Sequence, residues 1–358
     1  MTQHRRRSTA APAPRPDRTR VIGHLAIAAI LPYLLLKIAW IAGSTVGIVS
    51  ASPVDAAVLQ GGNLVTAAME VVAVLVILTF TRSWGLSVPP WLVLAPTWIG
   101  TGLLAPFVVT GPVVAVSVLG DPTSVGDGSL AAWVGPLVYL SFGAQAIGLS
   151  AAFVGHVRAR WSPVFTSRIA AGPAGPARPV ALASAWAATT LLSVVVVARV
   201  SWACGSTWGL PASVLGSRGI AEQLADGGTA VFAVAAAVGT LSLLHRRPRA
   251  GRTRVPLCLA WVGTGAIVGS GLYATTLLLS GITGPVSAAA GAVGFVDLLQ
   301  TLAGTVLAVV GASLLAGMAA DRAAPSVRPA EYAGGFPHPD PTSGPADRSP
   351  GTPLPRTQ

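Results

Sequence analysis

The chain has 358 residues, of which 52% are hydrophobic and 10% are charged, and its formal net charge is +11 at pH 7. A soluble domain carries about 25% charged residues, so this composition excludes an ordinary water-soluble fold and favours a bilayer as the solvent. The basic residues lie in the tails and in alternate loops without interleaved aromatic residues, which argues against a nucleic-acid-binding surface and indicates membrane orientation.

Residues 1–20 are rich in Arg and Pro and contain little to bury, so we predict a disordered basic cytoplasmic tail. The first apolar stretch has about 21 residues, which is long for a signal peptide and sufficient to span a bilayer. Eight transmembrane helices are predicted, over residues 22–43, 64–81, 91–118, 130–156, 180–204, 228–245, 255–280 and 289–319. Residues 321–358 are rich in Pro, Ser, Gly and Asp and are predicted to form a disordered cytoplasmic tail.

Two connecting segments, 44–63 and 205–227, contain turn-forming residues and are predicted to be long loops. The third predicted helix contains Pro96, Pro106 and Pro112. Prolines occur in membrane helices where neighbours satisfy the freed carbonyl groups, so we expect kinks or a break in this helix.

The segments on one side of the predicted helices contain 20 of the 23 Lys and Arg residues, whereas the other side contains only Arg218. This asymmetry predicts a multi-pass protein of the plasma (inner) membrane with both termini in the cytoplasm. The lipid bilayer is the expected partner, and the cytoplasmic Arg-rich loops would meet anionic lipid headgroups.

One motif occurs twice, 162 residues apart, and each copy has a basic residue, then Trp, then Gly-Ser-Thr. The first copy contains Lys37, Trp40, Gly43, Ser44 and Thr45, and the second contains Arg199, Trp202, Gly205, Ser206 and Thr207. A second pair, residues 98–102 and 261–265, is 163 residues apart. These echoes indicate a tandem duplication.

The expected fold class is an all-α integral membrane protein whose eight transmembrane helices form two four-helix repeats. The first repeat covers residues 21–157 and the second 180–320, with a cytoplasmic linker at 158–179. Because each unit has an even number of spans, the repeats should be parallel and related by a pseudo-twofold axis along the membrane normal.

Four ionisable residues lie inside predicted spans, namely Lys37, Glu70, Arg199 and Asp297. Each would cost at least ~2.5 kcal/mol near the bilayer centre unless it faces protein, water or a partner. The predicted helix bounds put all four in the outer leaflet. We expect either two ion pairs, Lys37–Glu70 and Arg199–Asp297, or a four-charge cluster between the halves.

Tyr139, Gln145 and Gln300 are polar residues of predicted helices that would add hydrogen bonds to these charges. Two interpretations stay open. The charges could only fix helix positions, with the long cations snorkelling to the interface. Alternatively they form a functional site: Lys37 is the only lysine of the chain, and a buried Lys can lose its proton whereas Arg cannot.

Trp40 and Trp202 follow the cations by three residues, and we expect an aromatic belt, with cation–π contacts as the alternative. The glycines of the repeated motif should form turns at helix ends. By contrast, Gly263, Gly265 and Gly269 lie mid-span, where we expect close helix packing.

Catalytic constellations are not visible in the sequence. The five histidines lie in tails or near helix ends without metal-ligand spacing, so we expect no metal, no cofactor and no enzymatic activity.

The Ala, Val, Gly, Arg and Pro bias, the near absence of Lys and the Pro-rich tail resemble polytopic membrane proteins of high-GC Gram-positive bacteria. This resemblance is compositional and carries no functional residues with it. The leading hypothesis is a small-solute transporter whose charges line a pathway between the halves. A non-transporting assembly or regulatory protein is the alternative, and an intramembrane lipid-modifying enzyme lacks visible catalytic groups.

Overall fold

The computed structural model describes residues 17–50, 56–121, 128–161, 178–211, 215, 218–245, 254–279 and 291–323. The helices in these ranges are α1 (Asp17–Ile41), α2 (Ala56–Thr81), the 3-10 helix η1 (Ser83–Leu86), α3 (Pro90–Leu104), α4 (Phe107–Gly120), α5 (Val134–Arg160), α7 (Arg178–Ala203), α9 (Ile220–Leu244), α10 (Arg254–Leu279) and α12 (Gly291–Ala323). With α3 and α4 taken as one segment, the described residues contain 8 spans that are long and apolar enough to cross a membrane. This confirms the prediction of a multi-pass α-helical membrane protein.

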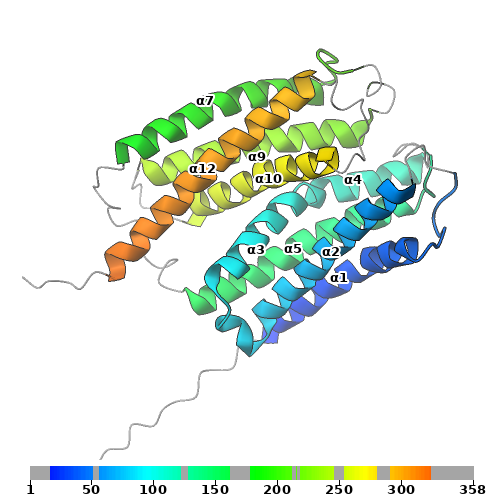
Figure 1. The fold of residues 1–358 in the computed structure, drawn as a ribbon, viewed down its shortest axis with the longest axis horizontal. Helices are drawn as coiled ribbons and strands as arrows, with labels where there is room; N and C mark the ends of the chain where they lie inside the picture. The colour runs from blue at the N-terminus through cyan, green and yellow to red at the C-terminus, as the bar shows by residue number, and fades with distance from the viewer. Residues whose placement is uncertain are drawn as a thin grey trace, which may run out of the picture.

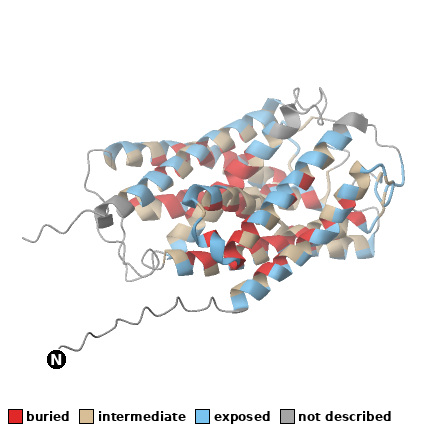
Figure 2. Cartoon of the chain, turned by 60° about the horizontal axis from the view of Figure 1, so that its bottom comes forward, coloured by how far each residue is buried: buried red, intermediate tan, exposed pale blue. Residues whose placement is uncertain are grey.

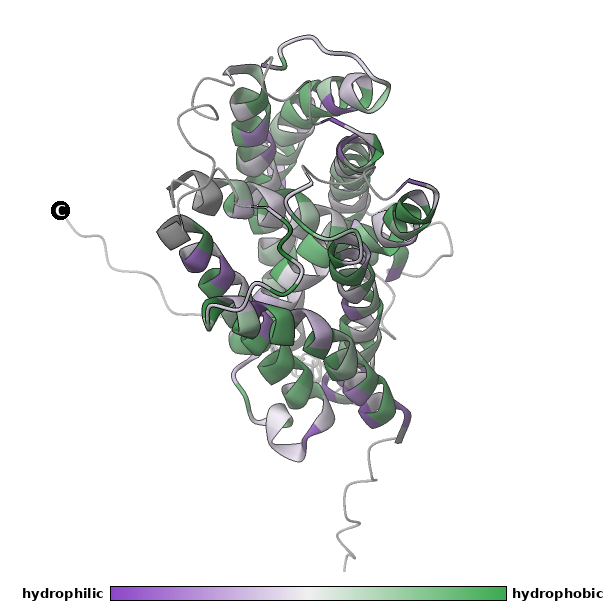
Figure 3. Ribbon diagram, turned by 90° about the vertical axis from the view of Figure 1, so that its right-hand side faces the viewer, coloured by the Kyte–Doolittle hydropathy of each residue, from purple (hydrophilic) through white to green (hydrophobic). Residues whose placement is uncertain are grey.

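The helices are apolar along most of their length (Figure 3), and many of their residues are exposed (Figure 2). Large hydrophobic side chains are among these exposed residues. Leu119 is 86% exposed and Val197 is 68% exposed. Helices that are hydrophobic all round satisfy their own backbone hydrogen bonds and are suited to a lipid environment. The outward faces are therefore the expected lipid-facing surface.

Two helix bundles lie side by side, one from each half of the chain (Figure 1). In the first bundle α1 packs against α2 and α5, and in the second α7 packs against α9 and α12. Each bundle has its own buried hydrophobic core. Ile30, Ile77 and Phe80 belong to the core of the first bundle, and Leu192 and Leu307 to that of the second.

The bundles meet mainly where α3 packs against α10, and two hydrogen bonds cross this contact in opposite directions. The indole of Trp98 donates to Thr264 Oγ1 at 3.1 Å, and the indole of Trp261 donates to Thr101 Oγ1 at 3.2 Å. The two donors, Trp98 and Trp261, are 163 residues apart in the chain, and so are the two acceptors, Thr101 and Thr264. Each half therefore donates one of these bonds and accepts the other.

Glycines allow the close approach of these helices. A Cβ on Gly102 would lie 2.0 Å from the carbonyl carbon of Gly265, and one on Gly265 would lie 2.6 Å from the Trp98 oxygen. A Cβ on Gly263 would lie 2.4 Å from the backbone nitrogen of Ala236. The prediction of close helix packing at these mid-span glycines is confirmed.

The third span is broken between α3 and α4, as its prolines suggested. Pro106 has no N–H to donate, and the chain restarts with Thr110 N donating to Pro106 O at 3.1 Å. A cavity of about 40 Å³ lies beside the break, between Leu103 and Pro106 on one side and Thr229 and Ser270 on the other. This volume is enough for a few water molecules.

The predicted loops 44–63 and 205–227 were too long, because α2 begins at Ala56 and α9 at Ile220. The error came from reading Gly61 and Gly62 as loop signals in the first segment, and the charges Glu222 and Asp226 as loop signals in the second. Glycine is common inside transmembrane helices, and Gly61 and Gly62 lie within α2. The predicted tails and linker lie mostly outside the described residues, although α1 starts at Asp17 and α12 continues to Ala323.

Candidate functional site

Both copies of the repeated motif end their helix in the same way. Gly43 and Gly205 have φ of 87° and 90°, a left-handed conformation that favours glycine. The indole of Trp40 donates to Val46 O at 2.7 Å, and that of Trp202 donates to Trp208 O at 3.0 Å. The expected turns at these helix ends are confirmed, and they place the preceding cations at equivalent depths of α1 and α7.

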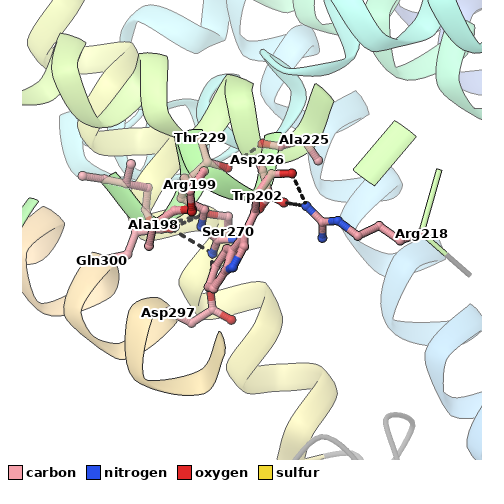
Figure 4. Close-up of polar contacts among 12 residues, drawn as sticks. Ala198, Arg199, Trp202, Arg218, Ala225, Asp226, Thr229, Ser270, Asp297 and Gln300 are labelled. Carbon is pink, nitrogen blue, oxygen red and sulfur yellow. Dashed lines mark hydrogen bonds and ion pairs between the residues drawn. The ribbon is translucent and has the colours of Figure 1, made fainter. Parts of the chain in front are cut away.

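In the second half, the turn positions Arg199 in a network of ion pairs (Figure 4). Its Nη1 donates to Asp226 Oδ1 at 2.7 Å, while its Nη2 bonds Asp297 Oδ1 and, at 3.2 Å, Gln300 Oε1. Gln300 is 1% exposed and donates to Ser270 Oγ at 2.8 Å. The predicted Arg199–Asp297 ion pair is therefore present, with Gln300 as the expected additional partner.

Asp226 also binds a second cation. Arg218, which precedes α9, donates to Asp226 Oδ2 and to the backbone oxygen of Trp202 at 3.0 Å. The side chain of Asp226 is 7% exposed. Two arginines and two aspartates thus neutralise one another, and the buried Nε atoms of the two guanidinium groups have no acceptor.

Sequence reasoning missed Asp226 and Arg218 because both fell in the predicted loop 205–227. A signal was present in the repeat itself. Asp226 follows Arg199 by 27 residues, and Asn63 follows Lys37 by 26. In both halves the cation of the first span bonds this polar residue of the second span at 2.7 Å.

The first half therefore has Asn63 where the second has Asp226. Lys37 Nζ donates to Asn63 Oδ1 at 2.7 Å and lies 5.0 Å from the ring centroids of Tyr33 and Trp40. Arg199 lies 5.5 Å from the Trp202 ring, which is 1% exposed. The aromatic-belt expectation is wrong for Trp202, and the cation–π alternative describes both tryptophans, because the tight turn folds each ring over its cation.

The predicted Lys37–Glu70 ion pair is absent from the described residues, in which the ion pairs within 4 Å are those of Arg199 and Arg218. Glu70 is instead 5% exposed and lies in the first bundle beside Gln145, whose Nε2 is 3.5 Å from Glu70 Oε1. The other carboxylate oxygen, Oε2, is buried and has no hydrogen-bond partner.

Glu70 also lies deeper in its span than predicted. With α2 starting at Ala56, Glu70 is the central residue of the span Leu59–Thr81, eleven residues or about 17 Å from either end. Lys37 is four residues, or about 6 Å, from the end of α1. The prediction that all four charges lie in the outer leaflet was wrong for Glu70, because it relied on a predicted start of this helix at residue 64.

The four-charge cluster between the halves is not formed either. The contacts of Lys37 and Glu70 stay within the first bundle and those of Arg199 and Asp297 within the second. Tyr139 is also not brought to the charges, since its ring packs against Phe107 with centroids 5.2 Å apart.

The candidate site is thus the polar cluster of Lys37, Asn63, Glu70 and Gln145 in the first half, of which Glu70 and Gln145 are buried and Lys37 and Asn63 half-buried. Such a cluster can bind a proton or a small polar solute, since it contains a cation, a carboxyl group and two amides. No three His, Cys, Asp or Glu side chains of the described ranges gather as metal ligands. Comparison with protein-family models, with curated proteins and with solved structures gives no match for this chain.

Proposed function

We propose that this multi-pass membrane protein is a small-solute permease of the plasma membrane, and that its pathway passes the polar cluster of the first half. The observation that carries the proposal is the arrangement of Glu70 and Lys37. Both are ionisable side chains of the first bundle, one an acid and the other a base, and yet they do not pair.

The second half of the same chain provides the comparison. There Arg199 and Arg218 both contact a carboxylate, and the acids are near helix ends, six residues from the starts of α9 and α12. Charges that only fix helix positions are expected to be paired in this way. A buried acid at the centre of a span, with one free oxygen, is costly and is a functional candidate by default.

The proposed architecture is a pair of four-helix repeats related by a pseudo-twofold axis along the membrane normal. The exchange of bonds between Trp98–Thr264 and Trp261–Thr101 supports it, since a twofold axis makes each contact occur twice. Gly102 and Gly265, which are 163 residues apart, contact each other and would lie at this axis. Both termini and the Arg-rich loops would be cytoplasmic and face anionic headgroups.

The alternative is a non-transporting assembly or regulatory protein, and one observation favours it. The bundles are tightly packed where α3 meets α10, and the cavity of about 40 Å³ beside the break in the third span does not touch Lys37 or Asp297. For the transport hypothesis we therefore place the pathway in the first bundle.

The test is solute uptake by proteoliposomes, measured as osmotic swelling against a panel of solutes. Wild type should accelerate entry of at least one solute, Lys37→Ala should lose this effect, and Met69→Leu should retain it. Met69 is 42% exposed on the outer face of α2 beside Glu70 and serves as the matched control. Entry no faster than in protein-free vesicles for every solute would overturn transport in favour of the alternative.

A further inference from the structure

We propose that Glu70 carries a proton in this conformation and that release of the proton draws Lys37 from Asn63 to the ionised carboxylate. This inference rests on the proposed function and names the proton as its coupling ion.

The surroundings of Glu70 suit the neutral acid. Its side chain is buried, no cation of the described residues lies within 4 Å, and its one polar contact among them is the amide of Gln145 at 3.5 Å from Oε1. An ionised carboxylate with one weak contact and one bare oxygen is strongly disfavoured in an apolar environment, and uptake of a proton removes that charge. Oε2, which has no partner, is then the protonated oxygen, and Oε1 remains the acceptor for Gln145.

A polar stripe connects this acid to one end of the bundle. Asn63, Thr66 and Glu70 follow one another at helical spacings of three and four residues, so they share a face of α2. The side chains of Asn63 and Thr66 are half-buried and that of Glu70 is buried, so the exposure of the stripe decreases toward mid-span. In the other direction the same helix presents Ile77 and Phe80, both 0% exposed, which close the path toward Thr81.

The groups that face Glu70 come from the helices packed against α2. Helix α1 supplies Lys37 and Tyr33, the two groups of that helix that would interact electrostatically with an ionised Glu70. Helix α5 supplies the neutral amide of Gln145, while its ionisable Tyr139 packs against Phe107.

The remaining neighbours contribute no charge to this site. The ring of His156 on α5 packs against that of Phe80, with centroids 5.2 Å apart. Phe80 is ten residues from Glu70 along α2. The sequences of α3 and η1 contain no ionisable residue. Lys37 is therefore the one cation among the described groups that can neutralise an ionised Glu70.

When Glu70 releases its proton, the Oε2–H bond breaks and the bonding electrons stay on Oε2. The proton passes to water or to a basic solute in the stripe. The carboxylate then attracts the Lys37 ammonium group, which leaves Asn63 and the rings of Tyr33 and Trp40. The amide of Asn63 becomes free to bind solute, so proton release and solute binding are coupled.

Infrared difference spectroscopy of the purified full chain in lipid nanodiscs tests the inference without any solute. Between two buffers that both lie well above the ordinary pKa of Asp and Glu, wild type should lose a carbonyl-stretch band of a protonated carboxylic acid as the pH is raised. Glu70→Gln should lack this band at every pH, and Met69→Leu should retain it. In Lys37→Met the band should persist to higher pH than in wild type, because no ammonium group is left to stabilise the carboxylate.

Circular dichroism and size-exclusion profiles establish that each variant is folded before its spectrum is compared. A wild-type spectrum without the band, or a band that survives in Glu70→Gln, overturns the inference. A band that responds to sodium at fixed pH rather than to pH assigns the site to a metal cation instead. A band without any solute uptake overturns the proposed function alone, and solute uptake without the band overturns the proton alone.

Discussion

Replacement of Asp226 by Ala should destabilise the protein more than the same replacement of Asp297, the other carboxylate of the second-half network. Its two oxygens hold the guanidinium groups of Arg199 and Arg218, and its side chain is 7% exposed. Removal of one partner of a buried ion pair leaves an uncompensated charge and costs about 3–5 kcal/mol of unfolding free energy. Arg218 would retain only the Trp202 oxygen.

Asp297→Ala provides the comparison, because the side chain of Asp297 is 31% exposed and Arg199 keeps Asp226 when it is removed. A hydrogen bond to a charged group, reduced for exposure to solvent, gives about 1–2 kcal/mol for this change. Asp226→Asn, which keeps the shape but not the charge, should fall between the two alanine variants.

Equilibrium unfolding in mixed micelles, followed by the fluorescence of the 10 tryptophans, measures these free energies. The combined change Arg199→Met and Asp226→Ala should cost less than the sum of the single changes, since the two residues are in direct contact. A cost for Asp226→Ala no larger than that for Asp297→Ala would refute the assignment of Asp226 as the centre of the network.

Three further changes can be measured by the same unfolding titration. Gly102→Ala puts a Cβ 2.0 Å from the Gly265 carbonyl carbon and should cost about 1–3 kcal/mol of unfolding free energy. Gly61→Ala, with open space around the new Cβ, should be neutral or stabilising. Equal costs for the two changes would contradict the close contact of α3 and α10. Trp98→Phe and Trp261→Phe each remove one hydrogen bond across the halves and should each cost about 1 kcal/mol from this bond, and a strongly unequal pair would speak against reciprocal contacts. Gly205→Ala at φ 90° should cost about 1–2 kcal/mol through backbone strain, and a neutral result would mean that the turn is not left-handed.

The membrane fold could be predicted from the sequence because its signals are long and local. Apolar stretches of about 20 residues can hardly satisfy their backbone polar groups in a bilayer except as helices. The break at Pro106 and the turns at Gly43 and Gly205 follow from the chemistry of single residues, and the structure has them where they were expected.

The site was less predictable because it depends on helix starts and on contacts between helices. An error of eight residues at the start of α2 moved Glu70 from mid-span to the outer leaflet. The same kind of error put Asp226 in a loop, so that Arg199 was given one carboxylate instead of two. Lys37 bonds Asn63 and not Glu70, and Asn63 lies closer to the depth of Lys37 in the bundle. Hydropathy alone gives the depth of a residue too coarsely to predict this choice.

A pair of double-mutant cycles at neutral pH tests the central claim that the buried cation and acid of the first half are not paired. The cycle of Lys37→Met with Asn63→Ala should give a coupling energy of about 1–2 kcal/mol, as expected for a hydrogen bond to a charged group. The cycle of Lys37→Met with Glu70→Gln should give a coupling within about 0.5 kcal/mol of zero, as for independent sites. A Lys37–Glu70 coupling larger than the Lys37–Asn63 coupling would show a structural ion pair and contradict the account.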